Sequence, residues 1–169
     1  MLYVTRFTKQ QGFTIIELLI GIIIIGLFST ITISSMRGFG EKKELEAQKD
    51  KFVTVLELAK KKARSGDAGG CTQLEHYEVE IQSTTSYQLK PICQTGTGTN
   101  ETFTVAQSSS ARISSYSSSI TSYAPISNQV SANCIVINDA TADSCYKLTV
   151  LESGIINEAN QSGANCTCN

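Results

Sequence analysis

The sequence predicts an α+β fold in which one long N-terminal helix packs on a small antiparallel β-sheet head. Three patterns in the chain predict it: an apolar run after a short basic N-terminus, a stretch of helix formers after that run, and alternating apolar and polar residues in most of the remainder. With 169 residues, the chain has room for one membrane helix and one domain of about 100 residues.

The apolar run, residues 13–36, is long enough to cross a bilayer, which takes roughly 20 mostly apolar residues. Arg6 and Lys9 precede it without an acidic residue, so this flank is expected on the cytoplasmic side. Glu17 is the only charged side chain between Lys9 and Arg37. Because a carboxylate at mid-membrane costs roughly 2.5–3.5 kcal/mol, Glu17 is predicted to have a charged partner and a function.

The residues around Glu17 carry a resemblance to a known signal. The run Gly12-Phe13-Thr14-Ile15-Ile16-Glu17-Leu18-Leu19 resembles the N-terminal signal of the type IV pilin superfamily, in which a basic leader ends in glycine and glutamate is the fifth mature residue. The resemblance implies that prepilin peptidase cuts between Gly12 and Phe13 and methylates the new amine of Phe13. It implies a pilin-like fold with these regions: a leader peptide at 1–12, a transmembrane and filament-core helix at 13–36, the soluble half of the helix at 37–65 and a disulfide-bonded β head at 66–169.

Cleavage would supply the partner that Glu17 requires. The new amine of Phe13 lies four residues before Glu17, hence on the same face of a helix. In a filament, the resemblance implies that the carboxylate meets the Phe13 amine of a neighbouring subunit, which offsets much of the cost of holding both charges in an apolar medium. The pair would also fix the axial register between subunits, as buried polar residues do in coiled coils. Glu17 is therefore predicted to be an assembly contact.

The helix is predicted to continue beyond the membrane, because Glu41 to Lys62 is rich in good helix formers. Five apolar residues fall at helical spacing and form a stripe that is predicted to pack on the head's own sheet. The stripe consists of Leu45, Phe52, Leu56, Ala59 and Ala63. Gly38 and Gly40 predict a bend or fray, and the glycine-rich segment 65–70 predicts the end of the helix.

The head is predicted to be an antiparallel sheet of four to six strands on the C-terminal half of the helix. Alternation predicts a first hairpin from residues 77–81 and 87–89. Later strand candidates are 102–106, 134–138 and 145–151. Residues 94–100 and 107–122 are rich in Ser, Thr and Gly, which predicts surface loops or weak edge strands.

All six cysteines lie in the predicted head, which the basic N-terminal flank places outside the cytoplasm, where disulfides persist. They are Cys71, Cys93, Cys134, Cys145, Cys166 and Cys168.

Two cysteine pairs are placed to bond across a hairpin ladder. Cys71 and Cys93 flank the first hairpin, and Cys134 and Cys145 flank a predicted turn at residues 138–141. The two remaining cysteines could bond to each other or separate between other partners. The sequence alone does not choose among the connectivities that six cysteines allow.

No catalytic residue, metal site or cofactor is predicted. The chain has no glycine-rich phosphate loop, no GxSxG, no HExxH and no CxxC pair. Its one histidine, His76, lies in an alternating strand between acidic residues and is expected to face solvent. Asp139 and Asp143 leave open a calcium site, which some pseudopilins have near the C-terminus, against the alternative of a solvated acidic turn.

Charge divides sharply along the chain. Residues 37–64 hold nine basic and five acidic side chains, whereas three basic and nine acidic side chains follow Arg64. The basic residues of the head are Lys90, Arg112 and Lys147. Because phosphate binding depends on Lys and Arg, nucleic acid is not an expected partner.

The segment 52–66 resembles the corresponding part of H-type minor pseudopilins of type II secretion and their fimbrial-T-like relatives. This resemblance implies a non-enzymatic minor pilin or pseudopilin; a major pilin forming the shaft, or a tip subunit that binds DNA or substrate, stays open. The implied partners are other pilin or pseudopilin subunits, the inner-membrane assembly platform, prepilin peptidase and membrane lipid. The implied location is a single pass through the inner membrane with the head outside the cytoplasm, followed by an extracellular pilus or a periplasmic pseudopilus.

Overall fold

The computed structural model describes residues 13–106, 110–125, 130–139, 144–162 and 166–168, except for the side chains of residues 28–38 and 162. The chain divides into two compact units, residues 1–37 and 38–169. One helix, α1 (Ile15–Ser65), is continuous across the boundary between them. The predicted bend or fray at Gly38 and Gly40 therefore does not interrupt the helix.

No helix among the residues that the structure describes is both long enough and apolar enough to cross a membrane.

Two predicted regions fall wholly or partly outside the described residues. The leader, residues 1–12, is one of them. The predicted membrane segment 13–36 is the other, because the side chains of its residues 28–36 are not described.

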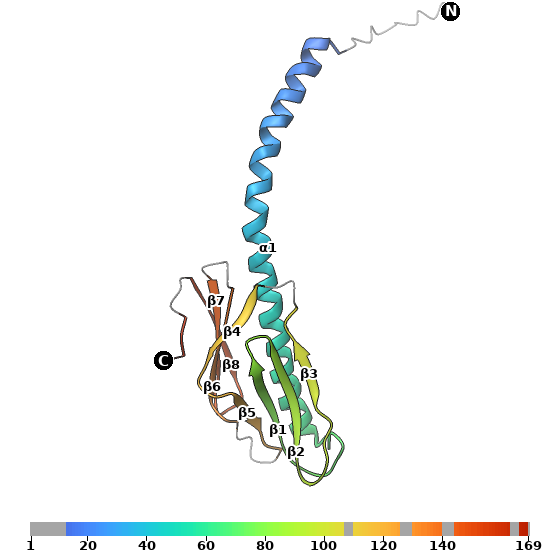
Figure 1. Ribbon diagram of the computed structural model, residues 1–169, viewed down its shortest axis with the longest axis vertical. Helices are drawn as coiled ribbons and strands as arrows, with labels where there is room; N and C mark the ends of the chain where they lie inside the picture. Colours follow the sequence, from blue (N-terminus) through green and yellow to red (C-terminus); the bar gives the residue numbers. More distant parts are fainter. Residues whose placement is uncertain (1–12, 107–109, 126–129, 140–143, 163–165, 169) are drawn as a thin grey trace, which may run out of the picture. The chain divides into compact units, whose positions relative to one another are not determined.

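Within the described residues, eight strands form two antiparallel four-stranded sheets in the second unit (Figure 1). Sheet A has the strand order β3-β2-β1-β5, and sheet B has the order β4-β6-β7-β8. The strands of sheet A are β1 (Cys71–Ser83), β2 (Ser86–Gly96), β3 (Glu101–Thr104) and β5 (Ile120–Tyr123). Those of sheet B are β4 (Ala111–Tyr116), β6 (Asn133–Asp139), β7 (Ser144–Val150) and β8 (Ile156–Ser162).

The α+β class and the antiparallel pairing are as predicted, but the single sheet of four to six strands is wrong. Strands β4 and β5 fall in the Ser-rich segment 107–122, and each lies at the edge of its sheet, as predicted for that composition. Strand β8 was not predicted, because its Asn- and Gln-rich sequence lacks apolar alternation and its residues 157–161 are exposed on both faces.

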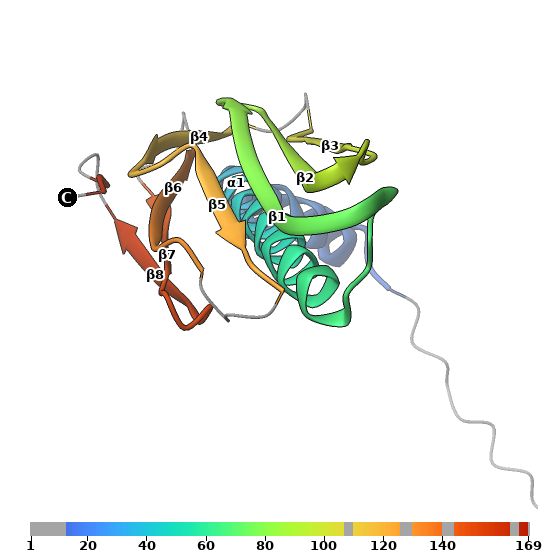
Figure 2. The ribbon, with the colours of Figure 1, turned by 90° about the horizontal axis from the view of Figure 1, so that it is seen from below.

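The part of α1 in the second unit is covered by sheet A on one side and by sheet B on another (Figure 2). The predicted apolar stripe is buried completely, with exposed fractions of 0–1% for Leu45, Phe52, Leu56, Ala59 and Ala63. The ring of Phe52 meets that of Tyr87 edge-on, at 4.6 Å between centroids. Burying a side chain such as Phe52 or Leu56 contributes about 1.5–3 kcal/mol, so this stripe organises the core.

Polar contacts from lysines beside the stripe fix the helix to both sheets. Lys49 Nζ lies 2.6 Å from Glu158 Oε2 of β8 and 5.2 Å from the ring centroid of Tyr146 of β7. Although burial lowers the pKa of Lys49, hydrogen bonds to Asp50 and Glu158 raise that pKa well above its usual value. Two further contacts are Lys60 Nζ to the carbonyl of Gly154 and Lys62 Nζ to Glu101 Oε1, both at 2.6 Å.

The helix ends at the predicted glycine-rich segment. Gly66 takes a positive φ of 68°, which a residue without Cβ adopts at little cost. Its N–H donates to the carbonyl of Ala63, and the N–H of Asp67 donates to that of Lys62. This pair of bonds is a Schellman motif, which satisfies carbonyls that the helix end leaves without partners.

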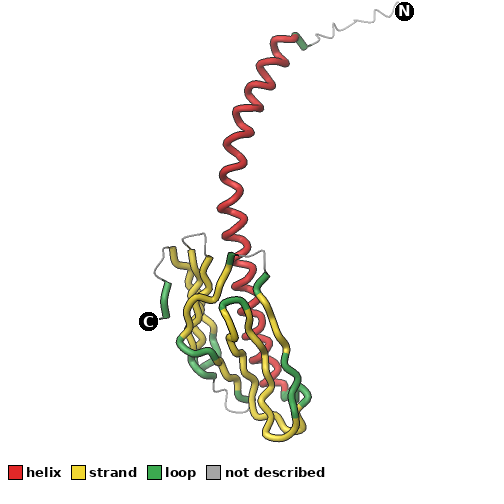
Figure 3. Tube along the Cα trace, viewed as in Figure 1, coloured by secondary structure: helices red, strands yellow, loops and turns green. Residues whose placement is uncertain are grey.

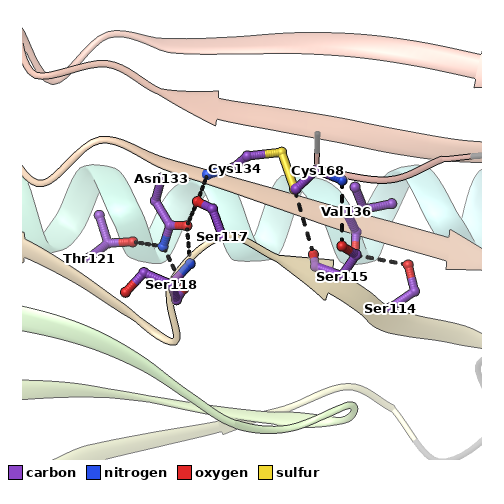
Figure 4. The surroundings of a disulfide bond; sticks show 9 residues. All are labelled: Ser114, Ser115, Ser117, Ser118, Thr121, Asn133, Cys134, Val136 and Cys168. Atoms are coloured by element: carbon purple, nitrogen blue, oxygen red, sulfur yellow. Dashed lines mark hydrogen bonds between the residues drawn. A yellow bond between two sulfur atoms is a disulfide. The ribbon is translucent and has the colours of Figure 1, made fainter.

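The buried amide of Asn133, at the start of β6, joins the two sheets (Figure 4). Its Oδ1 accepts hydrogen bonds from Ser117 Oγ at 2.8 Å and from the N–H of Ser118 at 3.1 Å. Its Nδ2 donates to the carbonyl of Ser118 and to Thr121 Oγ1, both at 2.8 Å. Asn133 therefore holds the crossing from β4 of sheet B to β5 of sheet A.

Replacing Asn133 with alanine is expected to lower the free energy of unfolding by about 2–3 kcal/mol, because each buried partner left unsatisfied costs about 1–3 kcal/mol. Urea unfolding of the full chain in detergent, followed by circular dichroism, measures the loss. The matched control is Asn157→Ala on exposed β8, which should change stability by less than about 0.5 kcal/mol. Equal effects of the two substitutions would contradict the joining role of Asn133.

Candidate assembly site

Thr14 is the N-cap of α1. Its carbonyl accepts the first helical hydrogen bond, from the N–H of Leu18 at 3.2 Å. Its Oγ1 accepts a bond from the N–H of Glu17 at 3.3 Å. In return, the Glu17 carboxylate accepts bonds from the N–H and the Oγ1 hydroxyl of Thr14, at 3.2 and 3.0 Å. This reciprocal arrangement is a capping box.

Glu17 is therefore held at the positive end of the helix. Both bonds from Thr14 end on Oε2, and no bond to Oε1 occurs within the described residues. A carboxylate in the first turn is also stabilised by the helix dipole. The carboxylate is thus bonded to Thr14, the residue that follows Phe13. Cleavage after Gly12 would turn the Phe13 nitrogen into a free amine. Of the predicted signal residues, Phe13 directly precedes Thr14, to which Glu17 is bonded, while Gly12 lies outside the described residues.

The role of Thr14 was not predicted, although the spacing Thr-x-x-Glu before an apolar run is the sequence signal of a capping box. The spacing is visible in Thr14-Ile15-Ile16-Glu17.

The first turns of α1 are apolar on all sides. Large apolar side chains here are between 48% and 88% exposed in this single chain. They are Phe13, Ile15, Ile16, Leu18, Leu19, Ile20, Ile22, Ile23, Ile24, Ile25 and Leu27. A helix that is hydrophobic all round is normally buried, in a membrane or among other helices. The segment around Glu17 therefore needs an apolar environment that a lone chain in water does not provide.

The six cysteines form three disulfides in the head. The bonds join Cys71 to Cys93, Cys134 to Cys168 and Cys145 to Cys166, with Cα–Cα distances of 5.4, 5.7 and 6.4 Å. The first is the pair that flanks the first hairpin.

The expected bond between Cys134 and Cys145 is wrong, and the register of the second hairpin explains why. Cys145 lies opposite Asn138 on β6, whereas Cys134 lies opposite Thr149 on β7. The two cysteines are thus offset by four positions along the ladder, or about 13 Å at about 3.3 Å per residue. A disulfide spans a Cα–Cα distance of only about 4.4–6.8 Å.

Residues 166–168, here called the C-terminal strap, cross the outer face of sheet B. Through Cys168 the strap is bonded to β6, and through Cys166 it is bonded to β7. The N–H of Cys168 also donates to Ser115 Oγ of β4, at 3.4 Å (Figure 4). Val136 alternates with core residues and so points to this outer face, yet its exposed fraction is 0%. The strap is therefore attached across part of the outer face of sheet B, by two disulfides and one hydrogen bond.

The other candidate residues do not form a metal or catalytic centre within the described part of the chain. His76 Nε2 lies 2.9 Å from Glu78 Oε1, and its Nδ1 lies 3.6 Å from Glu75 Oε1. No group of His, Cys, Asp and Glu among the described residues is arranged to hold a metal ion. For the calcium alternative, Asp139 is buried and Asp143 lies outside the described residues.

Comparison with known families matches residues 7–33 to the prokaryotic N-terminal methylation motif. The match contains Gly12, Phe13 and Glu17 and confirms the predicted prepilin-type signal of the type IV pilin superfamily. Such a signal implies a membrane-anchored chain that prepilin peptidase processes and that then assembles with other pilin subunits. No curated protein and no solved structure matches the chain.

Removing the disulfide that attaches the C-terminal strap to β6 is expected to destabilise the head. The double variant Cys134→Ser/Cys168→Ser opens a loop of 34 residues, which should lower the free energy of unfolding by about 2–4 kcal/mol. Thermal unfolding of the oxidised full chain measures the loss, with the reduced protein as the control in which the variant and the parent should converge. Peptide mapping without reduction provides a second check, and a Cys134–Cys145 peptide would contradict the connectivity.

Proposed function

We propose that this chain is a minor pilin or pseudopilin, a structural subunit of a type IV pilus or type II secretion filament that assembles through its N-terminal helix. The observation that carries the proposal is the methylation motif over residues 7–33, whose single carboxylate lies at the capped start of an entirely apolar helical segment. The minor subtype is supported by the resemblance of segment 52–66 to H-type minor pseudopilins.

The two carboxylate oxygens of Glu17 can bind two different partners. Oε2 accepts the bonds that cap its own helix. Oε1 is then available to the methylated Phe13 amine of a neighbouring subunit, a charge-assisted contact that is stronger than a neutral hydrogen bond. Because the cap holds the carboxylate in place before assembly, less side-chain freedom is lost when the neighbour arrives.

The apolar segment lets the subunit move from the lipid bilayer into the filament while its exposed side chains stay in an apolar environment. Lipid tails and the side chains of neighbouring helices are equally apolar, so transfer depends on packing and on the few polar contacts available. The Glu17–amine pair is the contact that distinguishes one register from another, because a shift along the axis would leave both charges unpaired.

Substitutions at Glu17 distinguish the contribution of its charge from the contribution of its bonds to the helix cap. Glu17→Gln keeps an oxygen that can accept the two bonds from Thr14 but removes the charge. We expect Glu17→Gln and Glu17→Ala to be cleaved normally but to enter filaments at least about tenfold less than the parent, since about 1.4 kcal/mol already changes an equilibrium tenfold. Immunoblots of membranes and of sheared filaments measure cleavage and incorporation.

Thr14→Ala is the control for the cap, because it removes the threonine hydroxyl and leaves the charge. It should cost only about 1 kcal/mol of helix stability and reduce incorporation less than Glu17→Gln does. Filament entry of Glu17→Gln at the parental level would refute the charge pairing.

A second candidate is a major pilin that forms the shaft. It is favoured by one observation: the second unit carries a basic apolar surface around Phe39 at one end and an acidic hollow around Glu152 at the other. Subunit abundance decides between the two. A minor subunit should make up a small fraction of sheared filaments in quantitative mass spectrometry, whereas a major pilin should dominate them and its deletion should abolish them.

A further inference from the structure

Phe39 is a prominent aromatic residue on the surface of the second unit. Its side chain is 66% exposed. Lys42 and Lys43 lie three and four residues later, hence on the same helix face. Lys43 Nζ lies 5.9 Å from the centre of the Phe39 ring and forms only an exposed ion pair, with Glu46. Lys42 has no ion-pair partner among the described residues. We call these three residues the basic knob.

An acidic hollow of about 560 Å³ lies elsewhere on the same unit. Its apolar lining comes from Ala124, Val130 and Ala132. Its polar lining comes from the carboxylates of Glu75 and Glu152 and from His76, Ser122 and Ser131. Both glutamates are exposed. Glu75 Oε1 lies 3.6 Å from His76 Nδ1, whereas Glu152 has no ion-pair partner within the described residues. The hollow therefore combines apolar walls with negative charge, the complement of an aromatic ring flanked by lysines.

The knob and the hollow lie at opposite ends of the head. Ser144, the first residue of β7, borders the hollow beside the knob, and Glu152, two residues beyond the end of β7, borders the acidic hollow. The six residue steps of β7 alone, from Ser144 to Val150, separate them by about 20 Å at about 3.3 Å per residue. The strands of sheet B run along the head between these ends (Figure 3). The knob of one molecule therefore cannot reach its own hollow.

Two different surfaces at opposite ends of one subunit support head-to-tail contacts, which produce open helical filaments when the rotation does not close. We propose that the basic knob of one chain docks into the acidic hollow of a second copy of this chain. This inference rests on the proposed filament role in its second form, a shaft-forming subunit, since it requires two copies of this chain side by side in a filament. The ring of Phe39 supplies the apolar contact, and Lys42 and Lys43 pair with Glu75 and Glu152 across the junction. The opposite charges of segment 37–64 and the head orient the approach of two copies.

The first test is photo-cross-linking in the full-length chain within producing cells. A photoreactive phenylalanine analogue replaces Phe39, and sheared filaments are irradiated and digested. The expected product is a cross-linked dimer of this chain, with the modified residue joined to the hollow at residues 122–124, at residues 130–132 or at Glu152. The same analogue at exposed Thr54 is the positional control and should not give that product.

The second test is charge reversal. Lys42→Glu/Lys43→Glu should lower filament incorporation about tenfold, and adding Glu75→Lys/Glu152→Lys in the same chain should restore it. The matched control reverses Lys51 and Lys61, two other exposed lysines of α1, and should leave incorporation unchanged. Retention of all three disulfides, read by gel shift after thiol labelling, shows that the variants fold.

The outcomes separate this inference from the proposed function. Filaments that contain the parental chain but give no such dimer, or reversed variants that assemble normally, overturn the docking contact and leave the filament role intact. Cross-linking of Phe39 to a different pilin overturns the choice of a second copy as the occupant. A parental chain that is cleaved but never found in filaments overturns the proposed function, and the docking contact with it.

Discussion

The head depends on one constraint: a single face of α1 must be covered by two sheets at once. The stripe from Leu45 to Ala63 is completely buried, and it joins inward-facing residues of both sheets in one core. Neither four-stranded sheet has another partner large enough to cover its apolar face within the described residues. The helix is therefore the shared centre of the core, and the connections between the sheets, above all Asn133, set the angle at which they enclose it.

The same arrangement explains which charged side chains form ion pairs and which stay exposed without a partner among the described residues. Lysines beside the stripe meet acidic or carbonyl oxygens of the sheets, as Lys49 meets Glu158 and Lys62 meets Glu101. At the two ends of the second unit, Lys42 and Glu152 stay exposed without ion-pair partners among the described residues. A positive helix and a negative head thus neutralise each other along the core and leave opposite charges at the two ends.

Features that depend on residues close together in the sequence could be predicted, and features that depend on distant residues could not. The stripe and the capped helix end depend on spacing and turn chemistry within a few residues, and they were predictable. So was the bond between Cys71 and Cys93, which close one hairpin. The bond from Cys134 to Cys168 was not, because it depends on the register of β6 against β7 and on a strap that returns from the C-terminus. Strand β8 was missed because its neighbour β7 and Lys49 hold it in place, while its own residues show no apolar alternation.

The N-terminal site followed the same rule. A function for Glu17 was predictable because a carboxylate in an apolar run is costly, and its hydrogen-bond partner at the start of the helix, Thr14, lies only three residues away. The sequence contained that contact in its spacing. The docking surfaces at the ends of the head, by contrast, come from residues as distant as Glu75 and Glu152, and only the fold brings them together.

The two assembly contacts differ in strength because they lie in different media. An unpaired carboxylate in a bilayer costs roughly 2.5–3.5 kcal/mol, so pairing Glu17 can decide whether a subunit is retained at all. Ion pairs in water contribute about 0–1 kcal/mol each, so Lys42 and Glu152 alone cannot hold a filament together. They can still discriminate, because like charges at the same junction would repel a wrong neighbour. On this argument the helix supplies the stability of assembly, and the ends of the head select which subunit comes next.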